Sequence, residues 1–72
     1  MAEIKYEIVN KIAILSERGD YTKELNKISW NDRPAKFDIR EWNHETERMG
    51  KGVTLTEDEV IALREALNAL DL

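Results

Sequence analysis

Two tryptophans with basic neighbours are the residues of this sequence best suited to a chemical task. Trp30 is followed by Arg33 and Lys36, and Trp42 comes two residues after Arg40. Exposed aromatic rings interleaved with Lys and Arg stack on single-stranded bases while the cations neutralise the phosphates. Aromatic residues in strands also serve as core packing, which is the alternative for each tryptophan. The sequence therefore predicts either a stacking surface or part of the core at these two positions.

The basic residues form the second part of this candidate site. Lys51 lies between Gly50 and Gly52, an arrangement that presents a charge beside open backbone amides. Acidic residues are interspersed among the bases, so an ordinary solvated surface is the alternative interpretation. The candidate nucleic-acid-binding residues are Lys23, Lys27, Trp30, Arg33, Lys36, Arg40, Trp42 and Lys51.

The distribution of charge along the chain matters more than its sum. A net charge of −4 opposes binding of a polyanion, because phosphate binding relies on Lys and Arg that release counterions. The segment from residue 56 onward carries all of this charge, with one arginine against five acids. Residues 18–40 hold six bases against four acids, so a basic region is separated from an acidic one.

The sequence offers no set of residues arranged for catalysis. The chain has no cysteine and a single histidine, His44, which excludes thiolate nucleophiles and zinc fingers. His44 lies near Glu45 and Glu47, but this set supplies neither enough metal ligands nor a positioned acid-base pair. We expect a solvated loop there, no metal or other cofactor, and no enzymatic activity.

The candidate residues must be positioned by strands. Alternating and β-branched segments predict strands at residues 4–15, 23–30, 36–43 and 53–55, with helix as the alternative for the first. Gly19 is the expected turn residue with positive φ, and Pro34 interrupts the chain before the third strand. Alternation along the first strand predicts a common face for Ile4, Tyr6, Ile8, Ile12 and Ile14.

The third predicted strand separates core from solvent. Phe37 and Ile39 are expected on the core face. The opposite face is expected to be solvated, and it carries Lys36, Asp38, Arg40 and Trp42. A polar loop is predicted at residues 44–49, followed by two glycines that let the backbone approach a neighbour closely.

A capping box predicts a helix that begins at Glu57. Thr56 is the N-cap and Glu59 completes the box, while acidic residues in the first turn favour the positive end of the helix dipole. An apolar seam follows at spacings of three and four, suited to packing on a sheet or on a twofold mate. The seam residues, which we predict as the dimer interface, are Val60, Leu63, Leu67 and Leu70.

The length of 72 residues predicts one small domain over residues 1–72, with the element order ββββα and a marginal core that dimerisation would complete. The sequence has no run of about 18 apolar residues that could span a membrane. Its N-terminus also lacks the layout of a signal peptide. We expect a soluble, cytoplasmic protein.

Three motifs stand in succession in the second half of the chain. Residues 37–42 read F-D-I-R-E-W, residues 49–55 read M-G-K-G-V-T-L after a polar loop, and the capped acidic helix follows. This combination resembles the positive cofactor four (PC4) family of transcriptional coactivators, most closely its short bacterial YdbC-type members. The resemblance covers residues 36–67, and residues 23–32 are also similar to the bacterial branch.

The resemblance implies an α+β fold, in which a four-stranded curved antiparallel sheet precedes one C-terminal helix, and a homodimer formed through the helices. It implies a surface for single-stranded DNA, with Arg40 and Lys51 at the DNA and Trp42 as the aromatic of the first motif. Eukaryotic members carry a second aromatic where this chain has Asn43, and Trp30 is expected to supply that stacking instead.

We therefore expect a homodimeric, largely sequence-independent single-stranded DNA-binding protein that serves as a transcriptional coactivator or regulator at the nucleoid. Backbone charge and stacking tolerate any base, so single-stranded RNA is a further candidate ligand. The alternative is a protein-interaction module that recruits a component of the transcription machinery through its acidic helix or a sheet edge.

Overall fold

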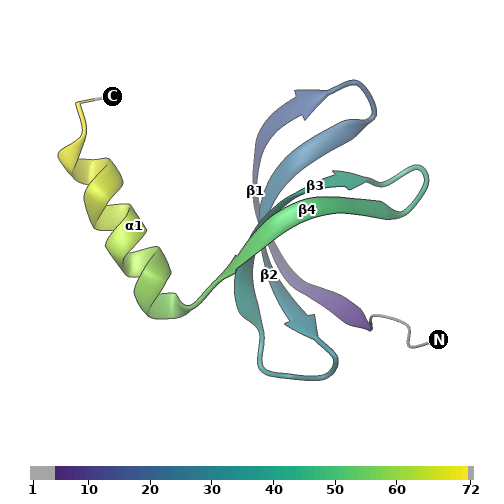
Figure 1. The fold of residues 1–72 in the computed structure, drawn as a ribbon, viewed down its shortest axis with the longest axis horizontal. Coiled ribbons are helices and arrows are strands. Elements are labelled where there is room, and N and C mark those ends of the chain that lie inside the picture. The colour runs from purple at the N-terminus through teal and green to yellow at the C-terminus, as the bar shows by residue number, and fades with distance from the viewer. Residues whose placement is uncertain (1–4, 72) are drawn as a thin grey trace.

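Residues 5–71 are described by a computed structural model, which contains one antiparallel sheet followed by one helix (Figure 1). The strands β1 (Tyr6–Arg18), β2 (Tyr21–Trp30), β3 (Lys36–Asn43) and β4 (Arg48–Leu55) neighbour one another in chain order, and the helix is α1 (Glu57–Ala69). The predicted order ββββα is confirmed. Ile4, the predicted start of the first strand, lies outside the described residues.

Three bulges shape β1. Its 13 residues oppose only the 10 residues of β2, and the register skips Val9, Ile12 and Leu15. A bulge inserts an unpaired residue, bends its strand and increases the local twist. The predicted common face is confirmed for Tyr6, Ile8 and Ile14, whose β2 partners are all even-numbered. It is wrong at Ile12, which a bulge leaves without a β2 partner, and Lys11 joins this face instead. The bent β1 wraps over one face of the sheet, which we call the concave face.

The concave face carries the even-numbered residues of β2 and β3 together with their partners on β1. Between β1 and β2, the paired residues on this face include Tyr6–Trp30, Lys11–Asn26 and Ile14–Glu24. Between β2 and β3, they include Thr22–Trp42, Glu24–Arg40 and Asn26–Asp38. The odd-numbered residues of β2 and β3 project from the opposite, convex face.

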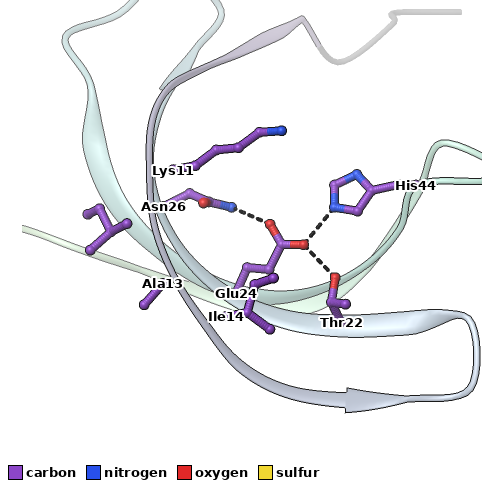
Figure 2. Close-up of a pocket in the computed structure, with 8 residues that line it drawn as sticks. Lys11, Ala13, Ile14, Thr22, Glu24, Asn26 and His44 are labelled. Atoms are coloured by element: carbon purple, nitrogen blue, oxygen red, sulfur yellow. Dashed lines mark hydrogen bonds and ion pairs between the residues drawn. The ribbon is translucent and has the colours of Figure 1, made fainter.

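The concave face is the more buried one, which corrects the prediction for the third strand. Asp38 is 0% exposed and Trp42 is 2% exposed, whereas Phe37 and Ile39 are only half-buried. The predicted solvated face is thus largely buried within the single chain at Asp38 and Trp42, because β1 curves along it (Figure 2), while Lys36 at its edge stays exposed. Polar side chains are tolerated there because they form hydrogen bonds with one another. The apolar residues of the convex face remain partly exposed in the single chain.

The turns follow the local chemistry of the sequence. Gly19 has a φ of 61°, as predicted for the turn between β1 and β2. Asn31 and Asp32 also have positive φ, and they form the turn that precedes Pro34. The backbone N–H of Asn31 donates to the carbonyl oxygen of Lys5 at 2.7 Å, which ties this turn to the residue before β1.

Strand β4 is longer than the sequence predicts. It begins at Arg48 and includes both glycines, so only residues 44–47 form the turn before it. A β-carbon at Gly52 would lie 2.2 Å from the β-carbon of Arg40 and 2.5 Å from the carbonyl oxygen of Ile39. The expected close backbone approach is confirmed at this glycine. Glycines weaken a strand pattern in the sequence, which explains why the first half of β4 was not predicted.

The helix begins as predicted but does not pack on the sheet. The Thr56 hydroxyl accepts from the backbone N–H of Glu59, whose carboxylate accepts from the backbone N–H of Thr56. No described side chain of α1 is buried, and Figure 1 shows the helix standing away from the strands. Leu67 and Leu70 of the seam are 47% and 58% exposed. Within residues 5–71, no helix has the length and hydropathy needed to cross a membrane.

Candidate nucleic-acid interface

Three aromatic rings and one guanidinium gather on the concave face. The ring of Tyr6 lies 5.7 Å from that of Trp30 and 5.5 Å from that of Trp42, measured between centroids. The guanidinium carbon of Arg40 lies 4.8 Å from the centre of the Trp30 ring. The two ring pairs are tilted, with 45° and 49° between their planes, and the guanidinium contact is of the cation–π kind. Trp30 remains partly exposed and Tyr6 is exposed, so the outer part of this aromatic cluster is accessible.

Arg40 is held in place by Asp38 beneath it. Its Nε and Nη2 atoms donate to the two carboxylate oxygens of Asp38 at 2.7 Å and 2.8 Å, a bidentate pair. Asp38 also accepts from the hydroxyl of Thr54 at 3.2 Å. Among the described residues, the remaining nitrogen Nη1 contacts the sulfur of Met49 at 3.6 Å. Arg40 therefore fixes the Trp30 ring and keeps one weakly engaged nitrogen for an external acceptor.

Trp42 is not an open stacking platform in the single chain. Its ring is covered by Tyr6 on one side and lies parallel to the His44 ring, with 6.0 Å between centroids and 5° between planes. The alternative considered for it, a core position, is the one that the structure confirms. The indole nitrogens of Trp30 and Trp42 are buried without a hydrogen-bond partner in the described part of the chain.

A polar network lies next to this cluster on the concave face, because Glu24 pairs with Arg40 and His44 stacks on Trp42. Glu24 is 4% exposed, and its carboxylate accepts from the hydroxyl of Thr22, from Nδ2 of Asn26 at 3.1 Å and from Nε2 of His44 at 2.6 Å (Figure 2). Burial raises the pKa of the Glu24 carboxyl, but these three hydrogen bonds outweigh burial and hold its pKa below the ordinary value. Glu24 is therefore a buried, ionised acceptor.

His44 and Lys11 are the residues that sequence reasoning missed. His44 was expected in a solvated loop, yet its ring is bound to Glu24 and stacked on Trp42, and about half of its side chain, 51%, stays exposed. Lys11 lines the groove above Glu24 because a bulge turns it toward Asn26. The sequence contains no short-range signal for either, since Glu24 and His44 are 20 positions apart.

The predicted basic residues divide between the two faces. Lys36 shares the concave face and Arg33 lies in the turn beside it, and both are exposed. Lys23 and Lys27 pair with Glu41 and Phe37 on the convex face, where the Nζ atom of Lys27 lies 5.2 Å from the Phe37 ring centre.

Lys51 is exposed on β4, in the irregular part of its pairing with β3. The structure thus brings Trp30, Lys36, Arg40 and Trp42 to one face with Arg33 at its rim, and separates Lys23 and Lys27 from them. DNA contacts by Lys23, Lys27 and Lys51 stay predictions. Among residues 5–71, no group of three His, Cys, Asp or Glu side chains could hold a metal ion.

The fold and this face define a small α+β protein with a bent sheet and an aromatic, partly basic inner surface. Comparison with known proteins assigns its family. The profile of Transcriptional Coactivator p15 (PC4) matches residues 19–66. An uncharacterised protein of Treponema pallidum (strain Nichols) is 46% identical over 71 residues, which cover 97% of this chain and 84% of that protein.

The chain therefore belongs to the PC4 family, and the resemblance found in its motifs is confirmed. Proteins of this family bind single-stranded DNA and are not enzymes.

Proposed function

We propose that this protein binds single-stranded DNA on the concave face of its sheet and serves as a transcriptional coactivator or regulator. The observation that carries the proposal is the aromatic cluster of Tyr6, Trp30 and Trp42 with Arg40 packed on it. An accessible aromatic surface with cations at its rim is what stacking on successive bases requires. Membership of the PC4 family supports the same ligand.

The aromatic and the basic residues of this face contact different parts of the strand. Trp30 and Tyr6 stack on bases, while Trp42 supports them from beneath because it is buried. Lys36 and Arg33 neutralise phosphates at the rim. Stacking and backbone charge read no base edge, so the main part of binding is independent of sequence, and single-stranded RNA is a second candidate ligand.

We propose that the functional unit is a homodimer. The single chain exposes 5945 Å², whereas a folded monomer of 8.4 kDa exposes about 4,600 Å². The excess of about 1,300 Å² exceeds the roughly 800 Å² that one partner buries in a standard interface and falls in the range of obligate homodimers. The uncovered seam of α1 and the half-buried convex face are the apolar surfaces from which such an interface would form.

Tryptophan fluorescence tests the binding face directly. We expect a mixed-sequence single strand of about 20 nucleotides to quench fluorescence in a salt-sensitive way, and a matched duplex to quench it little. Trp30→Phe should remove most of the quenching, whereas Trp42→Phe should retain it. Absence of both quenching and a mobility change at low salt would contradict the proposal.

The competing function is recruitment of a basic protein of the transcription machinery. The observation that favours it is the first turn of α1, where Glu57, Asp58 and Glu59 are all exposed. The two functions differ in their dependence on nucleic acid. Partners that remain bound after nuclease treatment would support recruitment, while loss of every partner would leave DNA binding as the function.

A further inference from the structure

A groove beside Glu24 on the concave face has the size and chemistry of a ligand site. Its volume is about 390 Å³, within the range of small-molecule pockets. Figure 2 shows the Glu24 carboxylate pointing into a space bordered by Asn26, His44 and Lys11, over which β1 curves. Ile14 of β1 adds an aliphatic side chain to the lining.

The floor of the groove is a hydrogen-bond acceptor with unused capacity. A carboxylate offers about four acceptor sites. In the described structure, Glu24 uses one site on Oε1 for Asn26 and two on Oε2 for Thr22 and His44. The remaining site on Oε1 suits an N–H donor and disfavours a carbonyl oxygen, because the group is ionised and buried.

One wall of the groove is a flat ring held at a fixed angle. The bond from Nε2 to Glu24 and the parallel contact with Trp42 together orient the His44 imidazole. About half of this side chain is exposed, so one part of it is open to a planar ligand. Histidine rings are among the side chains on which unpaired bases stack.

We infer that this groove takes one base of the bound single strand and selects bases that carry an exocyclic amino group. The base stacks on His44, its amino group donates to Oε1 of Glu24, and Lys11 binds a neighbouring phosphate or base carbonyl. Cytosine, adenine and guanine carry such an amino group. The only base N–H of thymine, at N3, lies between two carbonyl oxygens, which an ionised carboxylate disfavours as neighbours. The inference rests on the proposed function and adds a base preference to it.

Two single-stranded homopolymers of equal charge test this preference. Oligo(dC) and oligo(dT) of equal length, about 12 nucleotides, carry the same number of phosphates, so counterion release is matched. Mildly alkaline buffer keeps cytosine from pairing with itself. We expect the wild-type protein to bind oligo(dC) at least about fivefold more tightly than oligo(dT).

Two variants locate the source of the preference. Glu24→Gln keeps the shape of the side chain but removes its charge, and it should bring the ratio of the two affinities close to one. Glu45→Gln is the matched control, because it removes the same charge from an exposed neighbour of His44 outside the groove. His44→Ala should weaken binding of both oligonucleotides.

The outcomes separate this inference from the proposed function. Equal binding of both oligonucleotides by the wild type would overturn the inference while DNA binding stands. A preference that survives in Glu24→Gln would overturn the assignment to this carboxylate. Binding of neither oligonucleotide at low salt would remove the proposed function and the inference together.

A measurement on the wild-type protein avoids dependence on how the variants fold. In the complex with oligo(dC), we expect nuclear Overhauser effects between the His44 ring protons and a cytosine base. Their absence, in a complex that otherwise shows contacts to Trp30, would overturn the inference.

Discussion

At the scale of single residues, Trp30 and Lys36 share a face of the sheet but should contact different parts of a bound strand. Stacking is insensitive to salt, whereas a lysine at a phosphate releases counterions. Trp30→Ala should therefore weaken binding by about 1–3 kcal/mol with an unchanged salt slope. Lys36→Ala should lower the slope of log affinity against log salt by about one unit. Fluorescence anisotropy of a labelled strand at several salt concentrations measures both quantities.

Lys27 provides the matched control for this prediction. It carries the same charge as Lys36, but the register places it on the convex face beside Phe37. The sequence predicts a DNA contact for Lys27, but the proposed binding face does not include it, so Lys27→Ala should leave the salt slope at its wild-type value. A loss of slope equal to that in Lys36→Ala would show that the convex face binds the strand, against the proposed function.

Glu24 links the stability of the chain to pH. Its pKa is lower in the folded state than the ordinary 4.5, because the hydrogen bonds from Thr22, His44 and Asn26 outweigh its burial. The stabilisation is thus fully present above pH 4.5 and is lost as the pH falls through the folded-state pKa. The free energy of unfolding should fall more steeply with acid in the wild type than in Glu24→Gln.

Urea unfolding at about pH 7 and about pH 3 measures this difference. Glu45→Gln, which changes an exposed carboxyl, should keep the wild-type pH dependence. Identical acid sensitivity in Glu24→Gln and the wild type would show that the network at Glu24 adds no stability.

At the scale of elements, β4 depends on a close approach to β3 at Gly52. A β-carbon there would lie 2.2 Å from the β-carbon of Arg40, and the clash can be relieved only by moving backbone or Arg40 itself. Gly52→Ala should therefore destabilise the protein by about 1–3 kcal/mol. Gly50→Ala is the control, because its β-carbon would lie 3.4 Å from that of Glu41, an ordinary contact. Equal losses in denaturant unfolding would contradict this account.

Features of the elements that depend on local sequence could be predicted, whereas features that depend on strand pairing could not. The cap at Thr56 and the turn at Gly19 depend only on residues near them in the sequence, so local sequence predicts both. The bulges in β1 and the bond between Glu24 and His44 depend on which strands pair and in what register. Trp42 was assigned to a solvated face because alternation gives two faces but does not say which one a bent strand covers.

At the scale of the whole molecule, the single chain leaves its helix without a partner. The α1 seam is exposed, and the acidic charge of the chain is concentrated at this end, away from the basic region. Packing the helices of two chains against each other would cover the seams and keep both concave faces open to a strand. Such a dimer would explain how a chain with a net charge of −4 binds a polyanion, because the acidic helices would lie away from the binding face.

A charge placed in the seam tests the dimer. Leu67→Asp puts a carboxylate at a position that is 47% exposed in the single chain, so it should leave the sheet folded while its burial at an interface would cost several kcal/mol. Analytical ultracentrifugation should show a dimer for the wild type and a species of 8.4 kDa for Leu67→Asp. Asn68→Asp adds the same charge beside the seam and should remain dimeric. A monomeric wild type, or a dimeric Leu67→Asp, would contradict an interface at this seam, and retained DNA affinity in the monomer would show that each sheet binds alone.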